Sequence, residues 1–259
     1  MLIPREHGAY GQLLFPLVTV LGAGRSSAVA LGFALTAISG FLAHEGLAVL
    51  FGRRGGRALR ERRSAAVRSV AVFGAVGLVA GCAAFVASPP GVRHTVLATC
   101  ALAAVAMWLV RAGRERTVGG EVLIAVTLAS WCVPVGLAAR LGVSQVIGAW
   151  AVWSAMFAVA TLGVRGVIAR TRQERWRALC AGAVLVGAVS WWIMHRLALA
   201  GLVAEGMPLA LAPAGVLSFL SWLSSVRAHD LHRVGWTIVA AGVVTLALLF
   251  RALSLGVRS

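Results

Sequence analysis

Long apolar runs alternate with short charged breaks along most of the 259-residue chain. A helix needs about 20 apolar residues to cross the roughly 30 Å hydrocarbon core of a bilayer. The runs predict nine membrane-spanning helices, over residues 9–23, 28–51, 69–87, 94–110, 118–139, 145–164, 178–199, 208–225 and 236–255. The first is the weakest, because it is short and contains Gln12 and Pro16. The pattern predicts an all-α, polytopic integral membrane bundle with a single transmembrane domain over residues 1–259.

Composition supports this fold class. Hydrophobic residues make up 60% of the chain and charged residues only 12%, whereas a soluble domain has about a quarter of its residues charged. So few polar side chains cannot cover the surface of a soluble globule. A soluble enzyme, a disordered chain and a disulfide-stapled secreted domain are therefore excluded.

The charge is strongly positive, with a formal net charge of +16. Every basic residue is an arginine, and the arginines lie in short clusters between apolar runs. The breaks after the second, fourth, sixth and eighth runs are arginine-rich, whereas the other breaks hold one arginine at most. The positive-inside rule then predicts a cytoplasmic N-terminus, cytoplasmic arginine-rich loops and an outside C-terminus. We expect membrane lipids with anionic headgroups as partners, and no nucleic acid.

The adjacent residues His44 and Glu45 lie late in the second run. At 1.5 Å per residue they sit about 10 Å below the end of that helix. Ionisable residues within a membrane span often mark functional sites, so His44 and Glu45 are candidate catalytic residues. The alternative is structural, with Glu45 neutralising an arginine of the next loop.

A second polar cluster precedes and enters the first run. It contains Arg5, His7 and Gln12, with Tyr10 between them and glycines at positions 8 and 11. His7 is a further catalytic candidate, and Arg5 and Gln12 are candidate substrate-binding residues. The cluster is equally typical of an interfacial anchor, with Arg5 on headgroups and Tyr10 in the aromatic belt.

Other candidates fall on the same predicted side of the membrane. Glu121 opens the fifth run, Arg53 and Arg54 follow the second, and Arg165 follows the sixth. Arginine suits phosphate recognition, because its planar fork donates two hydrogen bonds at once. We expect these residues to form a polar, substrate-binding mouth at the cytoplasmic ends of the helices.

The N-terminal stretch Pro4-Arg5-Glu6-His7-Gly8-Ala9, together with His44-Glu45, resembles the YwiC-like membrane proteins. This resemblance implies a multi-pass protein of the bacterial inner membrane. It implies no particular biochemical activity.

The layout of nine helices also resembles the UbiA-type intramembrane prenyltransferases, in which aspartate-rich motifs after helices two and six hold Mg²⁺ and a prenyl diphosphate. Here the matching positions read Gly52-Arg53-Arg54-Gly55-Gly56-Arg57 and Gly163-Val164-Arg165-Gly166, and the only aspartate is Asp230. Mg²⁺ sites usually need carboxylates. We therefore expect no metal and no Mg²⁺ cofactor.

Three functions fit these residues. The first is binding or modification of an anionic lipid or isoprenoid-like amphiphile in a cytoplasm-facing pocket, with His44 or His7 as acid or base and Glu45 orienting it. The second is a proton-coupled transporter or permease. The third is a non-enzymatic membrane scaffold, whose arginines only set the topology.

Overall fold

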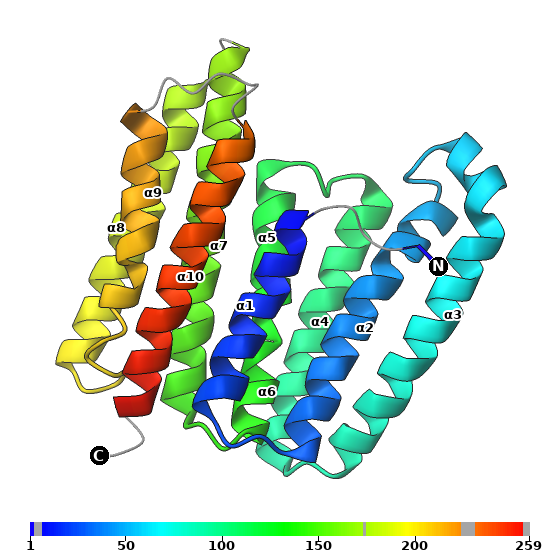
Figure 1. Cartoon of the computed structure of the whole chain (residues 1–259), viewed down its shortest axis with the longest axis horizontal. Helices are drawn as coiled ribbons and strands as arrows, with labels where there is room; N and C mark the ends of the chain where they lie inside the picture. Colours follow the sequence, from blue (N-terminus) through cyan, green and yellow to red (C-terminus); the bar gives the residue numbers. More distant parts are fainter. Residues whose placement is uncertain (3–6, 173–174, 224–230, 256–259) are drawn as a thin grey trace.

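The computed structural model describes residues 1–2, 7–172, 175–223 and 231–255, and this part of the chain is helical throughout, without strands. Successive spans run antiparallel and pack side by side, and α6 continues in the direction of α5 (Figure 1). Their bounds are α1 His7–Ala23, α2 Ala28–Leu50, α3 Gly56–Val86, α4 Pro90–Ala112, α5 Val118–Ser130, α6 Cys132–Ala138, α7 Val143–Thr171, α8 Trp176–Leu199, the 3₁₀ turn η1 Leu209–Leu211, α9 Ala212–Leu223 and α10 Leu231–Leu255.

The predicted all-α membrane bundle is confirmed. Seven spans in the described residues are long and apolar enough to cross a membrane: α2, α3, α4, α5 with α6, α7, α8 and α10. The other two predicted spans are shorter apolar helices, namely α1 and η1 with α9. The predicted fifth span is interrupted at Trp131, between α5 and α6. Pro134 explains this break, because it cannot donate a hydrogen bond to the preceding turn.

Two helices extend well beyond the predicted spans. α3 begins at Gly56 instead of residue 69, and α7 continues past residue 164 to Thr171. Arginine, glutamate and alanine favour helix, so the charged stretch before the third apolar run continues the helix instead of forming a loop. With 31 residues, α3 is about 46 Å long and therefore reaches outside a hydrocarbon core of about 30 Å.

The interior contains two clusters of buried apolar side chains. One surrounds α7 and includes side chains of α5, α8, α9 and α10. The other joins α1, α2, α4 and α6. Trp153 of α7 links α1 to the first cluster, since its ring stacks on Phe15 at 5.5 Å and its Nε1 donates to Thr19 Oγ1 at 3.1 Å. α1 therefore lies between α10 on one side and α2 on the other (Figure 1).

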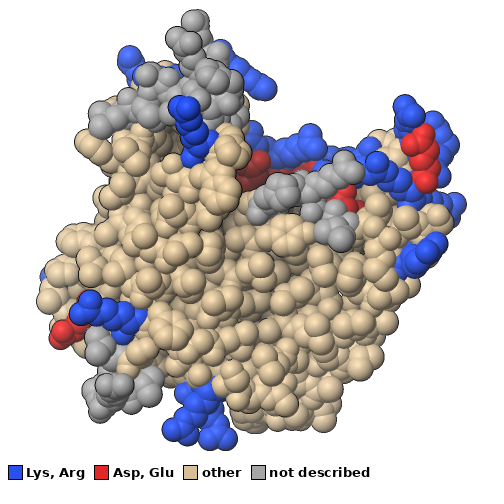
Figure 2. Space-filling model, viewed as in Figure 1, with Lys and Arg blue, Asp and Glu red and all other residues tan. Residues whose placement is uncertain are grey.

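The surface divides into bands. Charged side chains gather at the two ends of the helices, with a broad band of other residues between them (Figure 2). Large apolar side chains within that band are exposed, for example Leu78, Val79 and Trp192. An apolar surface of this extent requires lipid around it. The chain is therefore an integral, multi-pass membrane protein.

One residue outside the glycines, among those described, has a positive φ: Arg140, at 64°. It closes α6 as a left-handed cap, in which the Arg140 N–H donates to the Leu137 carbonyl and the Leu141 N–H to the Gly136 carbonyl. A side chain in this conformation costs about 1 kcal/mol. We expect Arg140→Gly to stabilise the protein by about 0.5–1 kcal/mol, measured by thermal unfolding in detergent.

Gly201 provides the converse variant. It closes α8 in the same way, at a φ of 68°, so Gly201→Ala should destabilise the protein by about 1 kcal/mol. If Arg140→Gly instead lowered the stability of the protein, the positive φ at Arg140 would not carry the energetic cost that we assign to it.

Candidate functional site

The arginine-rich segments predicted to share one side of the membrane lie together at one end of the bundle. We call this the arginine end and define it by residues 53–68, 111–116 and 165–177. It contains the C-terminal ends of α2, α4 and α7 and the N-terminal ends of α3, α5 and α8. Arg53 and Arg165 both bridge to carboxylates of other segments here, which shows that these chain segments are neighbours.

Glu45 and Arg54 form a two-pronged ion pair at the end of α2. Arg54 Nε donates to Glu45 Oε1 at 3.0 Å, and Nη2 donates to Oε2 at 2.6 Å. The side chains are 13% and 28% exposed, respectively. The chain turns back at Gly52, with a φ of 71°, where the Arg53 N–H donates to the Ala48 carbonyl. This Schellman cap brings Arg54 back over the last turns of α2.

The pairing of Glu45 with Arg54 is the structural alternative considered from the sequence. Both carboxylate oxygens of Glu45 accept hydrogen bonds from Arg54, which holds the carboxylate in one orientation. His44 precedes it on α2 and is half-buried. One turn earlier, Phe41 packs edge-on against Tyr10 of α1 at 4.9 Å. His44 and Glu45 therefore lie close to where α1 enters the bundle.

Arg53 connects α2 to the loop between α4 and α5. Its Nη2 lies 3.7 Å from Glu115 Oε1, and its guanidinium covers Gly113, where a Cβ would meet Nη2 at 2.4 Å. Gly113 closes α4 with a φ of 74°. A glycine is needed here both for the left-handed conformation and for the close approach of Arg53.

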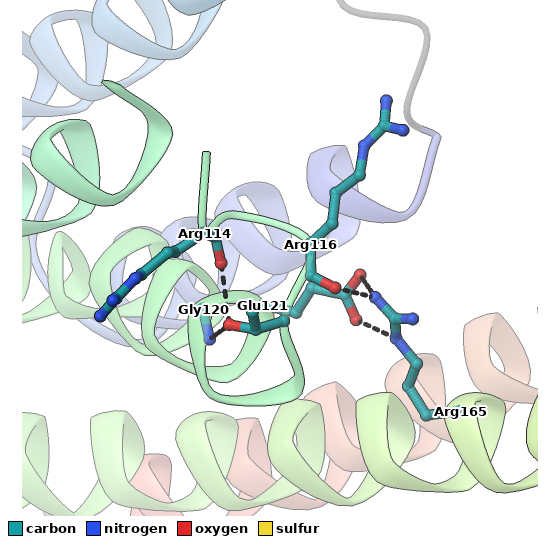
Figure 3. Close-up of polar contacts among 6 residues, drawn as sticks. Arg114, Arg116, Gly120, Glu121 and Arg165 are labelled. Atoms are coloured by element: carbon teal, nitrogen blue, oxygen red, sulfur yellow. Dashed lines mark hydrogen bonds and ion pairs between the residues drawn. The ribbon is translucent and has the colours of Figure 1, made fainter. Parts of the chain in front are cut away.

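Arg165 of α7 holds the other side of the same loop (Figure 3). Its Nε donates to Glu121 Oε2 at 2.9 Å, and its Nη2 donates to Glu121 Oε1 and to the Arg116 carbonyl. Thr117 caps α5 by accepting from the Gly120 N–H at 3.1 Å, and its hydroxyl donates to the Arg114 carbonyl at 2.8 Å. Residues 113–117 are therefore fixed from both sides.

The side chains of Arg114 and Arg116 extend from this fixed loop to opposite sides, away from the Arg165–Glu121 pair (Figure 3). Both are exposed. The sequence interpretation did not select them or Glu115. Two features of the sequence could have indicated this loop. One is the Gly-Arg dipeptide that follows both α2 and α4, at positions 52–53 and 113–114, and the other is Thr117 as a helix-capping residue.

The structure thus brings Glu45, Arg53, Arg54, Glu121 and Arg165 to one end of the bundle, joined in pairs. The remaining predicted residues are less closely connected to this group. Arg5 lies outside the described residues, and His7 is described only as the first residue of α1. Gln12 is half-buried on α1 and makes no hydrogen bond to the described part of the chain.

Within residues 1–2, 7–172, 175–223 and 231–255, no three His, Cys, Asp or Glu side chains are grouped closely enough to hold a metal ion. Among the described residues, Glu45, Glu61, Glu115 and Glu121 each form an ion pair with an arginine. The chemistry that this arrangement supports is recognition of an anion by guanidinium groups.

Comparison with known protein families supports the resemblance that the N-terminal motifs indicated. A family model described as YwiC-like protein matches residues 3–136, which run from the N-terminus into α6 and include Glu45, Arg53, Arg54 and Glu121. No curated protein matches the chain. No solved structure matches it either, so the likeness to the UbiA-type enzymes is one of layout alone. The family match covers more than half of the chain, and the protein therefore belongs to the YwiC-like family.

Proposed function

We propose that the arginine end binds the anionic headgroup of a membrane amphiphile, in a pocket that opens to the cytoplasm. The observation that carries this proposal is the loop of residues 113–117. Arg53 holds it from α2 and Arg165 holds it from α7, and it presents the exposed side chains of Arg114 and Arg116. Because the backbone of this loop is already fixed, only the side chain of each arginine has to be ordered when it binds an anion.

The ion pairs assign different tasks to the arginines. Arg54 and Arg165 are each held by a carboxylate through two donors, so the charges of these pairs balance and the pairs fix the backbone around the site. Arg114 and Arg116, which point to opposite sides of the loop, each contact the phosphate of an anionic headgroup on their own side. By the positive-inside rule this end faces the cytoplasm, and the family suggests the inner membrane of a bacterium. The amphiphile is an anionic lipid or an isoprenoid-like phosphate.

His44 is the residue that we assign to proton transfer, should the bound amphiphile be modified. An imidazole is the side chain chemically suited to both accepting and donating a proton. His44 lies next to Glu45, whose carboxylate accepts two hydrogen bonds from Arg54.

The test is native mass spectrometry of the purified protein titrated with phosphatidylglycerol and with phosphatidylcholine of the same acyl chains. An arginine near anionic lipid contributes about 1 kcal/mol, so Arg114→Gln/Arg116→Gln should weaken phosphatidylglycerol binding roughly ten-fold or more. The matched control is Arg196→Gln/Arg251→Gln, which removes two exposed arginines from the opposite end. Its affinity should equal that of the wild type.

A scaffold without a ligand is the second candidate function. It is favoured by the fact that Arg53, Arg54 and Arg165 all face carboxylates. This candidate predicts the same weak, headgroup-independent lipid binding for the wild type and both double variants. That result would overturn headgroup binding.

A further inference from the structure

An apolar groove of about 480 Å³ lies between α2, α3 and α4, away from the arginine end. Its position is set by how these helices pack. α3 packs closely along α2, but α4 packs on α5 and α6 instead of on its chain neighbour α3. The α3–α4 hairpin is therefore splayed, and α3 and α4 are the least buried of the seven spans.

The hairpin is held together at its turn. Arg93, near the start of α4, donates from Nε to the Phe85 carbonyl at 3.0 Å and from Nη2 to the Val86 carbonyl at 2.7 Å. Its guanidinium also lies 5.7 Å from the centre of the Phe85 ring. These contacts therefore hold the two helices together at the turn, and the groove beside them is open toward the lipid.

Glycines create the hollow walls. At Gly40 of α2 and Gly74 of α3, a Cβ would meet no other atom within 4 Å, so both face open space. Gly77 and Gly81 of α3 instead contact α2, where a Cβ would lie 3.2 Å from Ser39 and 3.0 Å from Thr36. One pair of glycines thus brings α2 and α3 together, and the other pair leaves the groove empty.

The dimensions of the groove select its occupant. It follows α3 from Phe73 to Val86, which is about 20 Å at the helical rise. Its volume over that length gives a mean cross-section of about 24 Å². A single extended hydrocarbon chain fits within this width. An α-helix, with a diameter of 10 Å or more, does not enter the groove fully and would lie along its open side.

The apolar lining of the groove and its position within the membrane indicate which molecule supplies the hydrocarbon chain. The groove is lined almost entirely by apolar atoms, with Phe33, Phe85 and Trp131 as its aromatic residues. It lies inside spans that cross the membrane and runs from the α3–α4 turn toward the middle of those spans. We infer that this groove binds one acyl chain of a phospholipid from the leaflet opposite the arginine end.

The groove shares no residue with the arginine end, so the two sites can be tested separately. The probe is a phosphatidylglycerol that carries a diazirine midway along one acyl chain, mixed into bilayer nanodiscs that hold the wild-type protein. After irradiation, peptide mass spectrometry locates the adducts. We expect adducts enriched on residues 73–86 and 96–100 over the lipid-facing surface of α8, a span of similar burial. Excess unlabelled lipid should abolish that enrichment.

A Cβ at Gly74 or at Gly40 would meet nothing within 4 Å, so Gly74→Leu and Gly40→Leu each place a side chain in the groove, from opposite walls. Each should reduce adduct formation in the groove to the level seen on α8. The matched control is Gly235→Leu on α10, an exposed helical glycine that also has no atom within 4 Å of its Cβ position; it should retain the wild-type enrichment. Unfolding temperatures identify any variant that fails to fold. Adducts spread evenly over all lipid-facing helices, enrichment that survives both leucines, or cross-links to a second copy in place of lipid would overturn the inference.

Discussion

Gly120→Ala is expected to destabilise the protein strongly, whereas Gly119→Ala, one residue earlier, is expected to be neutral or stabilising. A Cβ at Gly120 would lie 2.2 Å from the Arg114 carbonyl oxygen, which is backbone and cannot rotate away. At Gly119 a Cβ would meet nothing within 4 Å. Overpacking of this kind costs about 3 kcal/mol, while alanine in place of an exposed helical glycine contributes up to about 1 kcal/mol.

Thermal unfolding in detergent measures both variants under the same conditions. A cost of about 3 kcal/mol corresponds to a decrease of roughly 6–12 °C in Tm for a chain of this size. Gly120→Ala should also reduce phosphatidylglycerol binding, because moving the Arg114 carbonyl shifts the loop that presents Arg114 and Arg116. Equal unfolding temperatures for the two variants would mean that the loop moves freely, contrary to its anchoring by Arg53 and Arg165.

The second large decrease in stability is expected when Arg54 is replaced. Arg54→Ala leaves the Glu45 carboxylate, only 13% exposed, without its partner. Breaking a buried pair from one side costs about 3–5 kcal/mol. Because Arg54 is 28% exposed, water relieves part of this cost, and we expect about 2–3 kcal/mol.

A double-mutant cycle measures the interaction energy between Glu45 and Arg54 separately from the contacts that each makes with other residues. Glu45→Gln/Arg54→Gln removes both charges and keeps hydrogen-bonding groups, so it should cost less than Arg54→Ala alone. The measurement is chemical unfolding of the two single glutamine variants and the double variant, from which the coupling energy of the cycle follows. We expect a coupling of at least about 1 kcal/mol. A coupling near zero would show that the two side chains act independently, despite their two hydrogen bonds.

Most of the fold could be predicted from the sequence, because a bilayer imposes a minimum length on each apolar run. Within the described residues each of the nine predicted ranges lies on a helix or, for the fifth and eighth, on two consecutive helical segments. The extension of α3 to Gly56 could not be predicted in this way, because residues 57–68 are too polar to count as a span although they favour helix. The break at Trp131 could be suspected from Pro134, but its position depends on packing.

The candidate site was predictable only in part. The alternation of arginine-rich loops correctly predicted that Glu45, Arg53, Arg54, Glu121 and Arg165 share one end of the bundle. It could not assign partners, because the pairing of Arg54 with Glu45 depends on the turn at Gly52, and that of Arg165 with Glu121 depends on which helix packs beside α5. The groove gave no signal at all, since Gly40 and Gly74 look like any other glycines in an apolar helix.

Recognition of an anionic headgroup at the arginine end is tested most directly on the wild-type protein. The measurement is the dissociation constant for phosphatidylglycerol and for phosphatidylcholine of identical acyl chains, by native mass spectrometry at increasing ionic strength. We predict that phosphatidylglycerol binds roughly ten-fold tighter or more at low salt, and that this preference declines as salt screens the arginines. Equal affinity for the two lipids at every ionic strength would contradict headgroup recognition at this end.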